Sequence, residues 1–353
     1  MMLNWRIWIA LLAVGPLHIV ALEPPKAEIT NGQIRAVVYL PDAQSGFYRS
    51  TRFDWSGIVG SLKYGGHEYY GPWFHDVDPS VRDYKYDETG VVASSVSAAT
   101  GPAEEYETDG KGLGYDEAKG GGTFIKIGVG VLRKPSDEVK YDHYRQYEIA
   151  DPGKWSVHRS PAAVEFTQEL SDPATQYAYR YTKVVRLEAG RPRLVIEHIL
   201  KNTGSRTIRS SMYNHNFLPF ENHAPGPDLV TTAAYEIKTN RPPAKELGAI
   251  KGNQLVYLKT LEGKDQLAAS LTGFGTSAGD FDFRVEQRKT GAGIRIMGDR
   301  PLSNASVWSI RTVYALEPFV ALEIPPGSET KWKFTYEFYL LPKTGGTGHV
   351  AHE

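Results

Sequence analysis

Hydrophobic and polar side chains alternate with a period of two along most of the chain from about Ala27. The C-terminal run KWKFTYEFYLL shows this most clearly, since nearly every second side chain is apolar. Its apolar side consists of Trp332, Phe334, Tyr336, Phe338 and Leu340. Such alternation is typical of a β-strand with one buried face, so this run is predicted to be a half-buried strand.

Three strand-like runs follow one another between residues 177 and 220, namely YAYRYTKVVRL, RPRLVIEHIL and SRTIRSSMYNHNFL. The short segments EAG and KNTG separate them, and Gly190 and Gly204 are residues that turns favour. The pattern predicts three consecutive strands of one antiparallel meander. Within the third run, His215 is expected to share a face with Tyr213, whereas Met212 faces the other way.

Helical patterns are scarce: no long amphipathic helix is predicted, and only residues 79–84 fit a short one. Residues 101–122 are acidic and rich in glycine, and they are predicted to form one long loop, a kind of segment that is usually functional or mobile. No shift in composition marks a linker. We therefore expect an all-β fold, a single large antiparallel β-sandwich over residues 22–342, followed by a disordered tail at 343–353.

The N-terminus has the pattern of a secretory signal. Residues 1–6 carry one cation, residues 7–21 are apolar, and the sequence LEPPKAE that follows is polar. This arrangement predicts a signal peptide over residues 1–21 with cleavage after Ala21, which would make the mature chain an exported protein, periplasmic or secreted, with no stable membrane insertion. The alternative is a retained membrane anchor, for which the apolar stretch is short and is interrupted by Pro16 and His18.

Composition excludes several classes of function. The 353 residues have a net charge of −1 and no basic stripe, which argues against a nucleic-acid partner. Cysteine is absent, so disulfides, a thiolate nucleophile and a zinc–sulfur site are excluded. We find no serine nucleophile elbow, no phosphate-binding glycine loop and no HExxH zinc motif, and we predict no cofactor. The sequence gives no indication of oligomeric state.

An acidic cluster between residues 76 and 88 raises the question of calcium. Its members are Asp76, Asp78, Asp83, Asp87 and Glu88. Their spacing does not match an EF-hand loop, so a solvated acidic segment without a metal is favoured. Aromatic residues are 12% of the chain, a richness that suits β-strands and also suits sugar binding, since aromatic rings pack on the C–H faces of sugars.

Two early segments carry candidate binding residues. In YRSTRFDWSG (residues 48–57), an extended backbone would put Arg52 and Asp54 on one face, where they would serve a ligand or simply pair with each other. The segment HEYYGPWFHD (residues 67–76) holds two histidines among five aromatic residues, and Trp73 and His75 are its candidates.

Two later segments carry the remaining candidates. MYNHNF contains Asn214 and His215. WSIRTVYALEPF contains Trp308 and puts Arg311 and Glu317 at the same strand parity, and the proline that follows is predicted to end regular pairing and leave Glu317 at a strand end.

The order of these motifs resembles the aldose 1-epimerases and their galactose mutarotase-like relatives. That family has an early arginine before a Pro-Trp-Phe-like segment, an Asn-His pair on a strand followed by an aromatic, and a late glutamate before a Pro-Gly turn and a terminal aromatic strand. The matching positions here are Arg52, Pro72-Trp73-Phe74, Asn214-His215, Phe217, Glu317 and Pro326-Gly327. The resemblance extends over about residues 29–341, and it is closest to an exported branch of the superfamily.

The resemblance implies a sugar or oligosaccharide ligand and acid–base interconversion of sugar anomers. It makes Glu317 the base that takes the anomeric proton and His215 the acid that protonates the ring oxygen. Arg52 would anchor a hydroxyl or a charged substituent, and Trp73 or Trp308 would stack on the ring. If both catalytic groups reach one sugar, their reactive atoms should lie about 5–8 Å apart on a concave face.

Two other classes of function stay open. The chain could be a carbohydrate-binding or accessory module without turnover, in which case His215 is a structural residue. It could also be a polysaccharide-degrading enzyme, a glycosidase or lyase of the same fold. Hydrolysis uses two carboxylates across one bond, and Glu105 or Asp54 would then have to assist Glu317.

Overall fold

Residues 23–88 and 90–342 are described by the computed structural model of the chain. The predicted signal segment, its cleavage point and the tail at 343–353 lie outside these residues. The described part contains two single-turn 3-10 helices, Phe220–Asn222 and Ala278–Asp280, and is otherwise built from strands and turns. None of its helices has the length and apolarity needed to cross a membrane.

The largest element is a sheet of ten antiparallel strands. In spatial order the strands are β12 (Lys154–Ser160), β13 (Ala163–Asp172), β14 (Tyr177–Leu187), β15 (Arg193–Asn202), β25 (Glu329–Leu340), β22 (Ala292–Gly298), β21 (Asp282–Gln287), β17 (Leu229–Ala233), β19 (Gln254–Tyr257) and β18 (Gly248–Lys251). In β25 the side chains of Trp332, Phe334, Tyr336 and Phe338 are buried as predicted, whereas Leu340 at the strand end is exposed.

A five-stranded sheet forms the second main layer. Its strands are, in order, β20 (Gln266–Ser270), β23 (Asn304–Ile310), β24 (Val313–Ile324), β16 (Ile208–Leu218) and β8 (Gly101–Glu107). Three smaller sheets complete the chain. They are formed by β1 (Lys26–Thr30), β2 (Ile34–Tyr39), β3 (Val59–Tyr64) and β4 (His67–Tyr70), by β9 (Thr123–Lys126), β10 (Gly130–Arg133) and β11 (Glu148–Asp151), and by β5 (Asp76–Val77), β6 (Tyr84–Tyr86) and β7 (Val91–Ala93).

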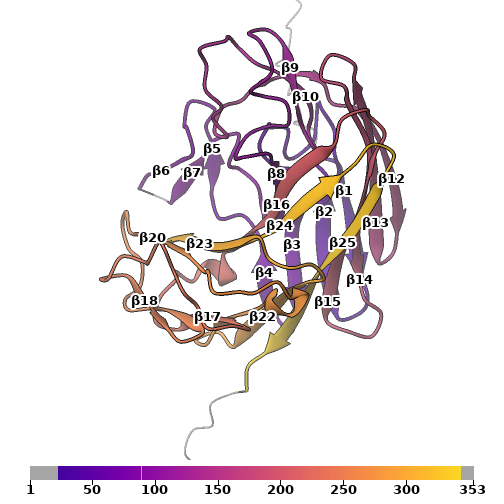
Figure 1. Cartoon of the computed structure of the whole chain (residues 1–353). Coiled ribbons are helices and arrows are strands. Elements are labelled where there is room, and N and C mark those ends of the chain that lie inside the picture. Colours follow the sequence, from indigo (N-terminus) through magenta and orange to yellow (C-terminus); the bar gives the residue numbers. More distant parts are fainter. Residues whose placement is uncertain (1–22, 89, 343–353) are drawn as a thin grey trace, which may run out of the picture.

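The main hydrophobic core lies between the two large sheets, as a β-sandwich requires. Figure 1 shows β16 and β24 side by side, crossing in front of β1 to β3, with β25 and β14 beyond them. Met212 of β16 and Leu322 of β24 share one buried cluster with Ile196 of β15 and Phe334 of β25. The predicted all-β antiparallel sandwich is thus confirmed, apart from one short parallel pairing between β5 and β7.

The predicted meander over residues 177–220 is only partly correct. Strands β14 and β15 pair with each other, but β16 leaves this sheet and pairs with β24 and β8 in the other layer. The connection between β15 and β16 is held by Asn202, whose buried amide donates to the carbonyl oxygens of Arg206 and Ile324 at 2.7 and 2.8 Å. A polar residue that bridges the two layers here directs the chain across the sandwich rather than back along it.

Two local predictions are wrong. Residues 79–84 form turns rather than a helix, since the Asp78 carboxylate accepts from the backbone N–H of Ser80 and the strand β6 begins at Tyr84. The predicted long loop at 101–122 begins with β8, which is buried between β16 and the rest of the protein. Glu104 and Glu105 of this strand look like loop residues in the sequence, but each is neutralised by a buried cation on its own face of the strand, Lys183 for Glu104 and Lys126 for Glu105.

Candidate functional site

A pocket of about 370 Å³ opens on the outer face of the five-stranded sheet. This size falls in the range of small-ligand sites. Residues of β8, β16, β23 and β24 form its floor, and the segments around residues 73, 97, 143 and 241 form its walls. The residues that line it include Arg52, Trp73, Glu107, His143, Tyr144, Tyr213, His215, Ser306, Trp308 and Glu317.

His215 and Glu317 lie side by side on the pocket floor. The pairings Tyr213↔Phe319 and Asn216↔Leu316 place His215 of β16 directly opposite Glu317 of β24. The His215 Nε2 atom lies 3.0 Å from Glu317 Oε1. Ser306, which is opposite Glu317 on β23, donates from its hydroxyl to Glu317 Oε2 at 2.8 Å. Register alone therefore brings an imidazole, a carboxylate and a hydroxyl into one row.

This contact corrects two predictions. The reactive atoms of His215 and Glu317 touch, instead of facing each other across about 5–8 Å. Glu317 is also not at a strand end, because β24 runs through Pro318 to Ile324 and Pro318 keeps its place opposite Ala305 of β23. The ladder to β16 is interrupted at Pro318, which lacks the backbone N–H needed for pairing.

Aromatic rings hold the His215 imidazole in one orientation. It stacks on Phe217 at a centroid distance of 3.8 Å, and the rings of Phe53 and Trp308 contact it edge-on at 5.9 and 5.8 Å. Its Nδ1 atom is buried and has no hydrogen-bond partner among the described residues. Burial, with a further contribution from the positive charge of Arg52, holds the pKa of His215 well below its usual value, so the imidazole is neutral at pH 7.

The carboxyl group of Glu317 is shifted in the opposite direction. Burial raises the pKa of Glu317 above its usual value, and the negative charges of Glu105 and Glu107 add to the shift. The hydrogen bond from Ser306 and the charge of Arg52 oppose it without reversing it. A raised pKa on the carboxyl and a lowered pKa on the imidazole bring the proton affinities of the two groups closer together, which favours proton transfer in general acid–base chemistry.

Behind the pocket floor, Arg52 belongs to a buried ionic cluster. Its Nε donates to Glu105 Oε2 at 2.9 Å, and Lys126 Nζ lies 2.7 Å from Glu105 Oε1. The Tyr213 hydroxyl donates to Glu105 Oε2 at 2.6 Å and accepts from Arg52 Nη2 at 3.2 Å. Burial alone raises the pKa of Glu105, but Lys126 and Arg52 outweigh it and hold the pKa at about 2. Arg52 and Tyr213 both reach the pocket from this cluster.

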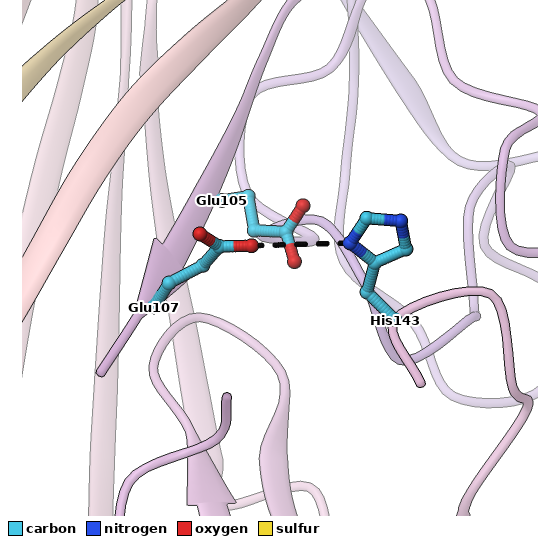
Figure 2. Close-up of side chains that lie close together, drawn as sticks. All are labelled: Glu105, Glu107 and His143. Carbon is cyan, nitrogen blue, oxygen red and sulfur yellow. Dashed lines mark ion pairs between the residues drawn. The ribbon is translucent and has the colours of Figure 1, made fainter. Parts of the chain in front are cut away.

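Three acid and imidazole groups gather beside this cluster, as Figure 2 shows for Glu105, Glu107 and His143. His143 Nδ1 lies 3.9 Å from Glu107 Oε1, and potential ligand atoms of all three side chains lie within 4.8 Å of one another. Glu105 is already neutralised by two cations, Arg52 and Lys126. A divalent ion at this position would lie next to both of them, so we assign no metal to the cluster.

The two candidate tryptophans have different environments. Trp73 is almost fully buried, stacks on Phe217 at 5.4 Å and donates from its indole N–H to the carbonyl of Ala99 at 2.9 Å. One face of its ring is therefore covered by Phe217, and little of its surface is accessible. Trp308 is half-buried and lines the pocket beside His215. Of the two tryptophans, Trp308 is therefore the one with the more accessible ring in the pocket.

Asp54 and Asn214 are not in the pocket, although the sequence suggested that they would be. The segment around Asp54 is irregular rather than extended, so Asp54 turns into the sandwich and contacts Ser56, Tyr181 and Lys183. Asn214 alternates with His215 along β16 and therefore faces the interior, where its amide donates to Glu104 Oε1 at 2.9 Å. Neither side chain reaches a ligand in the pocket.

His75 and Arg311 also lie elsewhere. His75 Nε2 pairs with Asp87 Oδ2 at 3.0 Å, beside the small sheet of β5, β6 and β7. Arg311 sits in the turn between β23 and β24, where it donates to the carbonyl of Gly90 at 2.9 Å and packs over the ring of Tyr86. Arg311 and Glu317 were expected to lie on the same face of one strand. They do not, because β24 begins only at Val313 and Arg311 precedes it.

Several residues that line the pocket were not among the predicted site residues, namely Tyr213, Glu107, His143, Tyr144 and Ser306. Tyr213 could have been found, since it shares the face of His215 at a spacing of two residues. Glu107 would follow from Glu105 by the same rule, once residues 101–107 are recognised as a strand. Ser306, His143 and Tyr144 depend on strand register and loop packing, for which the sequence has no local signal.

No family model matches the chain, and no curated protein matches its sequence. Solved structures do share its fold. The Slr1438 protein from Synechocystis sp. PCC 6803 is 12% identical, with a TM-score of 0.54 over 92% of this chain and 99% of that one. A galactose mutarotase related enzyme from Lactobacillus acidophilus is 12% identical, with a TM-score of 0.51 over 90% and 98%.

A galactose mutarotase-like protein from Clostridium acetobutylicum is likewise 12% identical, with a TM-score of 0.50 over 89% and 95%. These proteins match nearly end to end, so the predicted galactose mutarotase-like sandwich is confirmed as the fold of this chain. At such identities the likeness concerns the fold alone. Activity has to be argued from the site, because one fold supports many functions.

Proposed function

We propose that this chain interconverts the anomers of a reducing sugar in the pocket on the outer face of the five-stranded sheet. The observation that carries the proposal is the His215–Glu317 pair, with 3.0 Å between Nε2 and Oε1, on the floor of a 370 Å³ pocket. Trp308 supplies an aromatic wall for the sugar ring, and Arg52 and Tyr213 supply polar groups for its hydroxyls. The shared fold with galactose mutarotase-like structures supports a sugar as the ligand.

The chemistry needs two proton transfers. One group accepts the proton of the anomeric hydroxyl, and another gives a proton to the ring oxygen while the bond between C1 and that oxygen breaks. The open aldehyde then rotates about C1–C2, and both transfers run in reverse on the other face. In the free protein the two side chains touch, so a bound sugar has to enter between them and replace their contact with one contact to each oxygen.

The directions of the two pKa shifts assign the roles. Burial raises the pKa of Glu317 and lowers that of His215, so both shifts favour the Glu317 carboxyl over the His215 imidazole as the proton carrier of the pair. Glu317 is then the acid that protonates the ring oxygen, and the neutral His215 imidazole is the base that accepts the anomeric proton. This is the reverse of the roles that the family resemblance implies. In both assignments the His215–Glu317 pair carries the same number of protons. A pH–rate profile therefore does not distinguish them.

A second candidate function is hydrolysis of a glycosidic bond, which one specific observation favours. Glu107 and Asp83 line the same pocket as Glu317, so the pocket contains more than one carboxyl group. Inverting and retaining glycosidases both act through a pair of carboxyl groups. Glu105, considered for this role from the sequence, is fully buried and held by Arg52 and Lys126, and Asp54 lies outside the pocket.

The test compares wild type with Glu317→Gln in an NMR anomer-exchange assay over a panel of reducing sugars. We expect the variant to lose about 10²–10⁴-fold in exchange rate, because an amide is nearly isosteric but cannot transfer the proton, and to keep its affinity for the sugar. Glu323→Gln is the matched control, since Glu323 lies on the same strand, is exposed and does not line the pocket.

Infrared difference spectra test the role assignment. A protonated-carboxyl band at neutral pH that disappears in Glu317→Gln supports Glu317 as the acid, and a pure carboxylate signal contradicts it. If wild type and Glu317→Gln exchange anomers equally fast, Glu317 has no catalytic role. If wild type binds sugars without exchange, the chain is a binding module, and release of new reducing ends from an oligosaccharide would identify a hydrolase.

A further inference from the structure

A second cavity of about 350 Å³ lies beside the pocket and has no place in the mechanism above. It is bounded by the segment 47–50, by Phe74, by the loop at 77–81 and by residues 94–98. Tyr144 and Gln146 close the remaining side. The cavity is thus nearly as large as the pocket that contains Glu317, and both are large enough for one small ligand each.

The two cavities share a wall. Tyr144 lines both of them. Three other segments also line both spaces. Ser50, Phe74 and Val96 line the second cavity, and their near neighbours in the chain, Arg52, Trp73 and Ser97, line the pocket. Four separate stretches of chain therefore pass from one cavity to the other, which makes the two spaces parts of one extended site.

The shared wall is held in place by charged groups. Two guanidinium groups contact the Tyr144 ring, that of Arg52 at 5.3 Å and that of Arg82 at 4.7 Å from its centroid. Arg82 is paired with Asp142 at 3.2 Å, and the Asp142 carboxylate accepts from the backbone N–H of Tyr144. These contacts fix the position of a ring that lines both cavities.

The lining of the second cavity suits an uncharged sugar. The half-buried rings of Phe47 and Phe74, together with Tyr144, provide apolar surfaces, and Ser94, Ser95 and Gln146 are among its hydrogen-bonding groups. Of the described residues that line it, none carries a carboxylate, and the single charge is that of Arg49. Aromatic surfaces with interspersed hydroxyl and amide groups bind a ring that has C–H faces and hydroxyl edges.

We propose that this second cavity is a subsite for an additional, uncharged sugar residue, so that the chain acts on the reducing end of a di- or oligosaccharide. Only a reducing-end residue has a free anomeric hydroxyl, so that residue occupies the pocket with Glu317 and His215. The residue linked to it extends past Tyr144 into the second cavity. This inference rests on the proposed function of the first pocket, and it adds the length of the ligand.

Calorimetric titration with glucose, galactose and mannose, and with the reducing disaccharides cellobiose, lactose and mannobiose, tests the subsite. We expect at least one disaccharide to bind about tenfold more tightly than its reducing-end monosaccharide, the gain that one additional buried sugar face on an aromatic ring supplies. Ser95→Phe, which fills the second cavity, should remove this gain and leave monosaccharide affinity unchanged. Phe74→Ala should remove it by deleting an aromatic surface.

Leu258→Ala is the matched control for Phe74→Ala, because Leu258 is a large exposed apolar residue that lines neither cavity. Equal affinity for monosaccharides and disaccharides, unaffected by Ser95→Phe, would overturn the subsite while anomer exchange of monosaccharides still supports the proposed function. If no saccharide of either length binds or exchanges, the proposed function fails together with the subsite. A gain that survives both Ser95→Phe and Phe74→Ala places the second sugar elsewhere.

Discussion

Two consecutive glutamates of β8 illustrate how the same residue type acquires different roles on opposite faces of one strand. Glu104 points into the sandwich and Glu105 points toward the pocket, since side chains alternate along a strand. Both side chains are fully buried, and attraction to nearby cations outweighs burial and holds the pKa of each at about 2. The two therefore have the same exposure and the same charge state.

The surroundings of the two glutamates differ. Glu104 contacts Lys183 at 2.9 Å, His198 at 2.9 Å and Asn214, and Lys183 also pairs with Asp54 at 3.3 Å. None of these five side chains lines the pocket. All of these contacts lie within the sandwich. We interpret this Glu104 cluster as a structural connection between the two sheets.

The Glu105 cluster, in contrast, reaches the pocket through two of its members. Arg52 and Tyr213 hold Glu105 on one side and line the pocket on the other. Burial of charge alone is thus a poor indicator of function in this protein, because it occurs equally in both clusters. Access from a cavity is the property that distinguishes them.

Removing the cation of the Glu104 cluster should have the largest effect. We expect Lys183→Met to lower the free energy of unfolding by about 3–5 kcal/mol, because it leaves buried carboxylates without their partner. Urea denaturation measures the change. A loss below about 1 kcal/mol would mean that the cluster does not stabilise the sandwich, and the comparison with the Glu105 cluster would lose its basis.

Lowering the pH should reduce the stability contributed by Glu104 and Glu105, whereas the contribution of Glu317 should depend on pH with the opposite sign. The pKa of Glu104 and Glu105 is lowered on folding, so the stability they contribute is complete above the unfolded value near 4.5 and is lost as the pH falls toward 2. Each contributes on the order of 3 kcal/mol. The test is the free energy of unfolding between pH 6 and pH 2, which we expect to fall steeply below pH 4.5.

Glu317 should show the opposite sign. Its pKa is raised on folding, so its contribution is complete below its usual value and is lost as the pH rises through the folded value. Glu317→Gln should therefore gain stability relative to wild type as the pH rises from 4 to 7, and the same denaturation series measures this. A constant difference across that range would contradict the raised pKa.

The smallest effect is expected at the exposed pair on the same two strands as His215 and Glu317. Arg209 Nη2 lies 2.8 Å from Glu323 Oε1, but the side chains are 68% and 62% exposed. Solvent screens such a pair, so Arg209→Ala should change the free energy of unfolding by less than about 1 kcal/mol. A larger loss would show that position on this sheet, rather than burial, sets the strength of its ion pairs.

The chain's own pattern was enough to predict the all-β class, the buried face of β25 and the opposite orientations of Met212 and His215. These features depend on the alternation of side chains, which is a local property of an extended backbone. The motifs around His215 and Glu317 also indicated the galactose mutarotase-like fold, because a family resemblance can be recognised from the order of its motifs along the chain.

Tertiary structure alone decided which of the candidate residues meet. Strand register set His215 opposite Glu317 and Ser306, an irregular segment turned Asp54 away from Arg52, and the crossing of β16 between layers brought it against β8. The segment with Glu104 and Glu105 became a buried strand because Lys183, Lys126 and Arg52, distant in sequence, neutralise the two carboxylates. Such pairings between distant residues leave no local periodicity, and this is why the sequence by itself could not predict them.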